Sequence, residues 1–541
     1  MRSPAVQVIR AVLLALGCTL AFLGCASLTV PEETVPEAVT ELPPSFARAD
    51  SFAVYDPLRW WTAFDDPALN RLIDEALVAN LGLAEAVARV QEAEARARVT
   101  RADLLPSVTG SANGNQQDQP GNTGQFASFG AGGEPGADSL GGGASDRIAF
   151  TTYSATLAVS YDLDFWGRAR SETNAAVGDL YASAADLQTA RLSVLAEAIS
   201  TYFEVVDLRH RIGLTEETLG VLEDRIAVTE ARYERGLTGS FELYTVRQDF
   251  QATQANMPAL ERQLASAEGR LAVVAGRFPG DLDALLPDTL QPQLALDAVP
   301  PGLPSDLLIQ RPDVRAAAYR FEAARYRVGA ARAQLFPTVS LSGSIGLSAD
   351  EPAGLLDLDQ WISSFTAGLT APLFQGGRLR ANVEATRASY ERLGATYARS
   401  VLTAYQEVDA ALVAHQAERE RYQLLVAQLG EAVSSTQLQR DRVERGVGDV
   451  VDYLDAVRNE LGVRTTLAQT ARSVALARLD VHRALGGGWT ESGALPEIRL
   501  VEAEVALPEP LADRPAIPVV TIPAVPSVPD VTSAAATATD A

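Results

Sequence analysis

Four short runs of the chain alternate apolar and polar residues with a period of two, which is the pattern of β-strands. From Thr152 to Phe165 the odd positions are apolar or aromatic, and the even positions are mostly Ser, Thr and Asp. The runs that begin at Thr338 and Phe365 alternate in the same way, and Val108 to Gly114 is the weakest of the four. Such runs are typical of a β-barrel with one face toward lipid and one toward a wet lumen. A half-buried sandwich strand is the alternative for any single run, but the small Ser, Thr and Gly residues on the polar face favour the barrel.

Long helices are predicted after each pair of strands. Gly377 to Arg445 contains no Pro and is dominated by Ala, Leu, Gln, Glu and Arg, which are good helix formers. Gly167 to Arg235 is similar, and each stretch predicts a rod on the order of 100 Å long. A turn at Gly236 or Gly446 then leads into a shorter return helix, Phe241 to about Ala275 or Asp449 to Leu485. A coiled-coil scaffold would account for these rods but not for the strands.

The sequence contains an internal duplication. "ARYERGLTGSFELYTVRQ" begins at Ala231, and "DRVERGVGDVVDYLDAVRN" begins 210 positions later at Asp441. "LLPSVTGSANG" from Leu104 matches "QLFPTVSLSGSIG" from Gln334 at a slightly larger shift, so the first repeat holds an insertion between its strands. Residues 110 to 148 are almost wholly Gly, Ser, Asn, Gln and Ala, which predicts a long mobile loop.

The strand count predicts an oligomer. Four strands are too few to close a barrel, since the smallest barrels have about 8. An open sheet in lipid would leave costly unpaired edges. If the strands cross a membrane, several copies of the chain must therefore share one barrel.

The N-terminus predicts export and a lipid anchor. Residues 1–24 are typical of a lipoprotein signal peptide that ends before Cys25, with Cys18 as a competing and less well placed site. An ordinary signal peptide with incidental cysteines is the alternative. These are the only two cysteines, so we expect no internal disulfide in the mature protein. Beyond the signal, no stretch approaches the roughly 18 apolar residues of a membrane helix. The protein is thus expected to be soluble, lipid-anchored or a β-barrel.

Composition argues against a nucleic-acid partner and predicts a disordered C-terminal tail. The chain of 541 residues has a formal charge of −24, which argues against nucleic-acid binding because phosphate needs a basic face. Residues 490–541 are rich in Pro, Ala and Val without useful periodicity, which predicts disorder.

Longer stretches carry a resemblance to a known family. They are "WWTAFDDPALNRLIDEAL" at 60–77, "RPDVRAAAYRFEAARYRVGAARAQLFPTVSLSG" at 311–343, "APLFQGGRLRANVEA" at 371–385 and "ALGGGW" at 484–489. The sequence resembles the outer-membrane factors of tripartite efflux and secretion systems, the TolC-like family, and within it the lipoprotein (NodT- or OprM-like) branch. On this basis the chain divides into a signal peptide (1–24), a linker (25–56), repeat one (57–280), a second linker (281–304), repeat two (305–489) and the tail (490–541).

The resemblance implies a mainly α-helical, internally duplicated fold with a small β-barrel part. Three chains, with four strands each, would form a 12-stranded β-barrel in the cell outer membrane, continuous with a long α-helical barrel that spans the periplasm. The Gly-rich insertion and the turn near Ala349 to Asp359 would be extracellular. The turns at the helical tips would dock a periplasmic adaptor (membrane-fusion) protein through Arg235, Gly236, Leu237, Arg445, Gly446 and Val447. A plain hairpin turn that needs a positive φ is the alternative, and both interpretations can hold together.

The stretch "RGVGDVVDYLDAVR" at 445–458 raises the question of site chemistry. Its aspartates are separated by apolar residues and lack the Gly and Glu of a calcium loop, so they make a poor metal site. No sugar-binding cleft is indicated beside them. The three histidines are scattered without zinc or triad spacing. We therefore expect no enzyme activity, no cofactor and no metal.

The same aspartates suit a helix start and a gate. Asp449 is placed to cap the return helix. The resemblance assigns Asp452 and Asp455 to a constricting acidic ring, with Val451 as an apolar constriction and Glu242 as the repeat-one equivalent of Asp452. In a trimer each position becomes a ring of like charges that favours cations. A solvated helix face is the alternative for this pair.

The leading hypothesis is a passive outer-membrane exit channel of a tripartite efflux pump, which carries drugs and toxic compounds from an inner-membrane pump and its adaptor. The alternative is a non-conducting, lipid-anchored helical scaffold.

Overall fold

The computed structural model describes residues 30–32, 36, 59–120, 147–280, 299 and 310–487. The chain divides into two compact units, Met1–Leu500 and Val501–Ala541, and all described residues belong to the first. The predicted signal peptide, Cys18, Cys25 and the tail lie outside the described residues. So do residues 121–146 of the Gly-rich insertion and, apart from Val299, the second linker.

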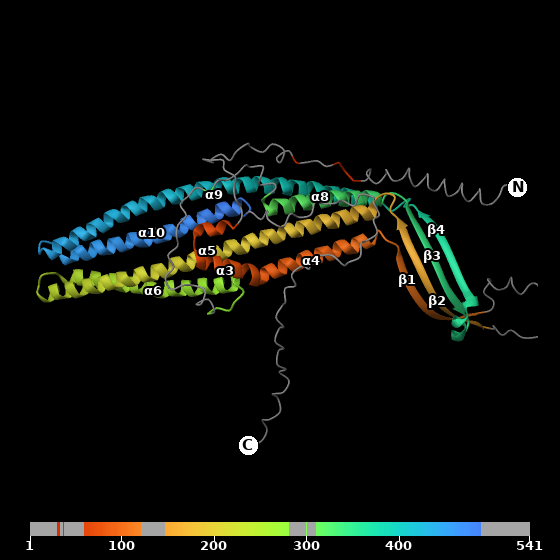
Figure 1. Ribbon diagram of the computed structural model, residues 1–541, viewed down its shortest axis with the longest axis horizontal. Coiled ribbons are helices and arrows are strands. Elements are labelled where there is room, and N and C mark those ends of the chain that lie inside the picture. Colours follow the sequence, from red (N-terminus) through yellow and green to blue (C-terminus); the bar gives the residue numbers. More distant parts are fainter. Residues whose placement is uncertain are drawn as a thin grey trace, which may run out of the picture. The chain divides into compact units, whose positions relative to one another are not determined.

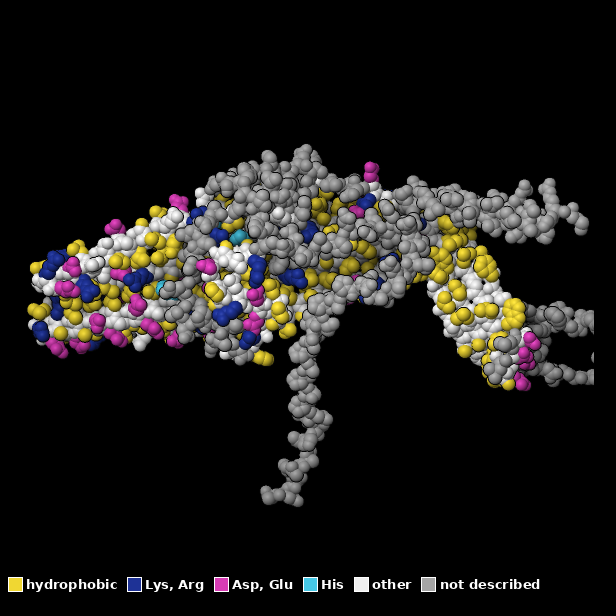
Figure 2. All heavy atoms as spheres, in the orientation of Figure 1, with side chains coloured by type: hydrophobic (Ala, Val, Ile, Leu, Met, Phe, Trp, Pro, Cys, Tyr) yellow, Lys and Arg dark blue, Asp and Glu magenta, His cyan; other side chains and the backbone are white. Residues whose placement is uncertain are grey.

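Four antiparallel strands form one sheet in the order β1-β2-β3-β4, so β1 and β4 are its edges. The strands are β1 (Ser107–Pro120), β2 (Arg147–Leu163), β3 (Thr338–Ala349) and β4 (Trp361–Thr370). The register pairs Val108 with Val159 and Leu157 with Ile345, which lines up the predicted apolar face across the strands. Figure 2 shows mostly hydrophobic and uncharged side chains on the visible face of the strands, whereas both signs of charge cover the helical hairpins.

The predicted loop from 110 to 148 is wrong at both ends. β1 continues to Pro120, and β2 already begins at Arg147. Gln116 and Gln117 lie opposite Thr151 and Phe150 in the ladder. Ladder hydrogen bonds join backbone groups and do not require apolar side chains, so the polar composition concealed the strand. The turn after β3 contains two short 3-10 helices, η4 (Pro352–Leu356) and η5 (Leu358–Gln360).

The long helices pack side by side in a fixed order (Figure 1). The first repeat has η2 (Trp60–Phe64), α3 (Pro67–Ala79), α4 (Leu81–Ala102), α5 (Arg168–Glu234) and α6 (Ser240–Val274). The second has α8 (Pro312–Ala333), α9 (Arg378–Glu444) and α10 (Val450–Ala484). Toward the tips the order is α9, α10, α5, α6, and nearer the strands it is α9, α8, α5, α4. None of the helices in the described ranges is long and apolar enough to cross a membrane.

The duplication is confirmed in the helix lengths. α5 and α9 both have 67 residues, and α6 and α10 both have 35. α4 and α8 both have 22. The long helices are offset by 210 positions, whereas α4 and α8 are offset by 231, because the inserted residues lie between them and the long helices.

The largest apolar core lies where η2 and α3 pack on α5, α6 and α10, with Leu69, Leu72 and Ile73 fully buried. Asp66 fixes the start of α3, since its Oδ1 accepts hydrogen bonds from the backbone N–H groups of Ala68 and Leu69. Its Oδ2 accepts a 2.5 Å hydrogen bond from the Tyr202 hydroxyl on α5. Burial, followed by this contact, raises the pKa of Tyr202.

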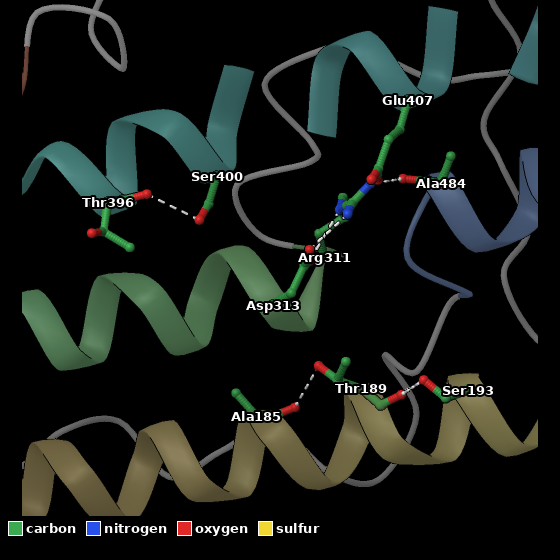
Figure 3. A network of polar contacts seen from close by, with 9 residues as sticks. All are labelled: Ala185, Thr189, Ser193, Arg311, Asp313, Thr396, Ser400, Glu407 and Ala484. Carbon is green, nitrogen blue, oxygen red and sulfur yellow. Dashed lines mark hydrogen bonds and ion pairs between the residues drawn. The ribbon is translucent and has the colours of Figure 1, made fainter. Parts of the chain in front are cut away.

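Each repeat closes with the same kind of joint at the far end of its return helix. In the second repeat, the buried Arg311 donates to the Ala484 carbonyl at 3.0 Å and pairs with Asp313 at 2.6 Å and Glu407 at 2.7 Å (Figure 3). In the first repeat, the Asn80 side-chain amide donates to the Val274 carbonyl at 2.9 Å. Val274 and Ala484 are equivalent positions, so both joints satisfy the last carbonyl of a return helix, and both use the residue that precedes α4 or α8.

Candidate functional site at the helical tips

Both tip turns have the geometry that the sequence predicts. Gly236 has φ 69° and Gly446 has φ 73°, which is the left-handed region that favours glycine. The residue after each glycine donates its N–H five positions back, Leu237 to the Arg232 carbonyl at 2.8 Å and Val447 to Arg442 at 2.9 Å. This pattern ends a helix with its last carbonyls satisfied. The first hairpin (α5 and α6) and the second hairpin (α9 and α10) therefore turn in the same way.

The residues predicted to dock an adaptor all lie on the exposed surface of the turns. Leu237 is 67% exposed and Val447 is 70% exposed, so both apolar side chains are accessible to a partner. Arg235, Gly236, Arg445 and Gly446 are exposed beside them. Phe241 (84% exposed) and Tyr244 (65% exposed) on α6 extend the apolar surface of the first tip. The second repeat has Val451 and Leu454 at these two positions, and Leu454 is buried.

Asp449 caps α10, as the sequence predicts. Its carboxylate accepts a 3.0 Å hydrogen bond from the Val451 N–H. The same carboxylate pairs with Arg232 of α5 at 2.6 Å, a contact that the sequence interpretation missed. The hydrogen bond from Arg232, followed by the one from Val451, lowers the pKa of Asp449. Asp449 therefore both starts α10 and ties it to the first hairpin.

Asp455 also has a partner within the chain. Its Oδ1 accepts a hydrogen bond from Arg225 of α5, whose side chain is only 14% exposed. One step further along α10, Arg458 pairs with Asp249 of α6 at 2.8 Å. Three ion pairs thus join α10 to the first hairpin near the tips.

The remaining predicted gate residues do not bridge the hairpins. Asp452 is exposed, and Val451 is partly buried at the start of α10. Glu242 accepts a hydrogen bond from Thr238 within its own turn. The hydrogen bond to Asp449 is the largest cause of the raised pKa of Arg232, and the charges of Glu242 and Asp452 add to it. These acids are therefore near enough to act on Arg232, which places them in one electrostatic cluster.

A signal for Arg225, one of the two missed arginines, was present in the duplication. The first repeat has Gly239 at the position of Asp449 and Thr245 at the position of Asp455, so both acids occur in the second repeat alone. Conversely, Arg225 stands where the second repeat has Ser435. A charged residue that is present in one repeat and absent at the equivalent position of the other is a candidate for a contact between the repeats. A comparison of the two repeats for such residues would have selected Arg225 and Asp455.

Other chemistry is sparse in the described residues. They contain no group of three or more His, Cys, Asp or Glu residues arranged to hold a metal ion. His415 and His482 are buried, and His482 stacks on Trp60 at 4.5 Å. Burial, followed by the charge of Arg478, lowers the pKa of His415 to about 4 and that of His482 to about 3. Both are therefore neutral packing residues at physiological pH.

Comparison with known proteins agrees with this geometry. The sequence model of the family described as "Outer membrane efflux protein" matches residues 72–277 and 303–487. Outer membrane protein OprJ of Pseudomonas aeruginosa is 32% identical over 92% of this chain and 98% of its own length. The toluene efflux pump outer membrane protein TtgC of Pseudomonas putida is 30% identical over 88% of this chain and 96% of its own. The crystal structure of the open state of the Neisseria gonorrhoeae MtrE outer membrane channel has 27% identity and a TM-score of 0.71, covering 85% of this chain and 98% of that one.

Four strands continuous with paired helical hairpins define the outer-membrane channel class. The chain belongs to the outer membrane efflux protein family. It is an outer-membrane exit channel of an efflux pump, which confirms the predicted family, fold class and location. The matched proteins are channels and pump components rather than enzymes.

Proposed function

We propose that three copies of this chain form one passive duct that releases small toxic or drug-like molecules, and that the α5–α10 ion pairs hold its periplasmic end closed. The observation that carries the proposal is the set of Arg–Asp contacts between hairpins at the tips, Arg232–Asp449 and Arg225–Asp455. The name of the toluene efflux relative supports small apolar cargo.

The two edges of the chain consist of different elements, so one edge of a copy can pair with the other edge of the next copy. One edge of the chain consists of β4 and α9, and the other of β1, α4 and α6. Each edge strand has unpaired backbone groups that only another strand can satisfy in lipid. Twelve strands from three chains fall within the range of known barrels. A chain that runs only as a monomer in mild detergent would contradict this assembly.

At the tips, threefold repetition turns single residues into rings. Asp452 and Asp455 would form acidic rings, with Val451 and Glu242 beside them, and such rings favour cations. Opening would require α10 to leave α5, because Arg225 and Arg232 hold it against the first hairpin. The closed state thus depends on ion pairs that a docking partner can replace.

Conductance in planar bilayers tests the gate. We expect Arg225→Ala, and Asp455→Ala paired with Asp452→Ala, to raise single-channel conductance several-fold over the parent channel. Arg247→Ala is the matched control, because Arg247 of α6 pairs with Glu230 of α5 inside the first hairpin and this pair does not connect the two hairpins. The charge swap Arg225→Asp with Asp455→Arg should restore low conductance.

Two outcomes would count against the proposal at different levels. Unchanged conductance in every gate variant would return the aspartates to a solvated helix face. No conductance at all, even from the Asp452→Ala, Asp455→Ala protein, would favour the scaffold over the duct.

The partners are proposed to be a periplasmic adaptor and, through it, an inner-membrane efflux pump. The adaptor would contact Arg235, Gly236, Leu237, Arg445, Gly446 and Val447. Because Leu237 and Val447 are exposed and apolar, Leu237→Asp and Val447→Asp should weaken adaptor binding at least tenfold by surface plasmon resonance. Leu424→Asp is the control, because Leu424 is exposed on α9 and lies 20 residues before the end of that helix at the tip. The proposed lipid on Cys25 would hold the N-terminus at the outer membrane.

A further inference from the structure

A short N-terminal segment lies against α8. The carbonyl of Pro31 accepts a hydrogen bond from Nη1 of Arg325 at 3.1 Å. A Cβ placed on Gly329 would lie 2.7 Å from Cγ2 of Val30 and 3.3 Å from its Cα, so no side chain larger than hydrogen fits there without displacing the segment. Val30 and Pro31 are both partly buried. Gly329 and Arg325 therefore form a notch that the N-terminal segment occupies.

The walls of the notch are held by contacts that do not involve the N-terminal segment. Glu322, one turn earlier on α8, holds the Arg325 guanidinium with contacts of 2.5 and 2.9 Å. The Arg325 side chain is 16% exposed, and its guanidinium lies 5.1 Å from the ring centre of Tyr326. Ser171 of α5 forms the other wall, with Oγ 3.3 Å from the Gly329 Cβ position. An arginine oriented in this way can donate to a carbonyl with little loss of side-chain entropy.

The notch lies close to the junction of helices and strands. Gly329 precedes Phe336 by seven residues, which cover the last turn of α8 and the turn that follows it, about 10 Å at a helical rise. Phe336 stacks on Trp166 with ring centres 4.6 Å apart, and the Trp166 indole N–H donates to the Pro337 carbonyl at 2.7 Å. Aromatic residues at the ends of barrel strands mark the membrane–water interface. The aromatic pair therefore indicates the height of the membrane surface, which the lipid anchor must reach.

We propose that the Gly329–Arg325 notch is the docking site of the N-terminal arm and fixes how far the lipid on Cys25 can reach. The proposal rests on the acylation of Cys25. Val30 lies five positions after Cys25, and a fully extended chain spans at most about 3.6 Å per position, so the reach is about 18 Å. That is enough to cover the roughly 10 Å to the aromatic pair with about 8 Å to spare. Cys18, 12 residues away, would have a reach of about 43 Å and would be held by no such limit.

The first test asks whether the notch holds the arm. The full mature protein, reconstituted in lipid nanodiscs that leave both membrane faces accessible, is treated with a Glu-specific protease, and cleavage after the exposed Glu32 is followed by mass spectrometry. Gly329→Val should raise the cleavage rate about tenfold, and Arg325→Ala should raise it less. Gly213→Val on α5 is the matched control, because a Cβ there meets nothing within 4 Å. Equal rates in Gly329→Val and the parent, with both proteins still trimeric, would overturn the docking site.

The second test asks whether the lipid is limited by the notch. Deleting residues 26–28 leaves only Thr29 between Cys25 and Val30, so two steps of chain give a reach of about 7 Å, which is shorter than the distance required. In the acylated protein this deletion should pull the arm from the notch and speed cleavage at Glu32. The same deletion with Cys25→Ser, exported by a non-lipoprotein signal, should stay protected. Equal cleavage in the two would overturn the reach limit. Mass spectrometry of the Cys25 peptide reports acylation separately, so an unmodified cysteine would refute the anchor while the result of the first test stands.

Discussion

The two helical hairpins share a backbone but not a set of contacts. α5 and α9 have equal lengths, end at equivalent residues and turn through equivalent glycines. α5 is packed on both sides and is buried at intervals from Ala169 to Thr229, whereas α9 lies at an edge and has fewer buried positions. Duplication therefore copied the scaffold, and later substitutions fitted each hairpin to its own place.

Charge shows the same division. Each ion pair that joins the hairpins uses at least one residue found in only one repeat, such as Arg225 and Asp455. Contacts inside a hairpin, such as Arg247 with Glu230, also lack a counterpart in the other repeat. At the closing joints the geometry is kept while the side chain differs, Asn80 in one and Arg311 in the other. Substitutions at positions where the two repeats carry different residues measure how much each repeat now depends on its own contacts.

The largest effect is expected from Arg311→Ala. The change removes a buried guanidinium and leaves Asp313, Glu407 and the Ala484 carbonyl without their shared donor. We expect the free energy of unfolding to fall by about 3 kcal/mol, measured by chemical denaturation in detergent. Arg320→Ala is the control, because Arg320 and Asp186 are both 46% exposed and such pairs contribute about 1 kcal/mol or less. Equal losses for the two variants would contradict a buried joint.

Asn80→Ala should have a smaller effect at the equivalent joint. Asn80 caps α4 by accepting from the Leu83 N–H and donates to the Val274 carbonyl, with no charged partner to leave unpaired. A loss of about 1 kcal/mol is expected in the same denaturation assay. A loss as large as that of Arg311→Ala would mean that the uncharged joint at Asn80 contributes as much to the free energy of unfolding as the charged joint at Arg311.

At neutral pH the smallest effect is expected at His415, and this effect grows as the pH falls. The first repeat has the buried Val205 at this position, and Ala272 at the position of His482. Because the pKa of His415 is lowered to about 4, below the usual value near 6.5, the unfolded chain binds the extra proton. Stability should therefore fall as the pH drops from about 6.5 toward 4. His415→Val should make the thermal midpoint less dependent on pH over that range, and an unchanged slope would contradict this account.

The sequence predicted most of the fold because its main signals are local. Proline-free helical stretches located α5 and α9, and the return helices were placed within one residue of their observed bounds. Strand β1 was cut short, because Gln116 and Gln117 belong to the ladder through their backbones alone. Polar strands carry no hydrophobic period, so they are the elements that a pattern of this kind misses.

The site was predicted less completely, because ion pairs join residues far apart in the sequence. The cap at Asp449 is local and was identified, and the tip glycines were identified for the same reason. Arg232 and Arg225 lie more than 200 positions from their partners and became visible only once α5 and α10 were placed side by side. The roles of Asp452, Val451 and Glu242 remain predictions that conductance can test.

Equal helix lengths also limit how this chain can change over evolutionary time. Removing one residue from α5 alone would rotate everything beyond it by about 100° and shorten the rod by about 1.5 Å. Its tip would then stop at a different level from that of α9, and Arg225 would face away from Asp455. Insertions and deletions in these rods are therefore tolerable only in matched sets, applied to both repeats and close to whole turns, so related chains should differ in composition far more freely than in length.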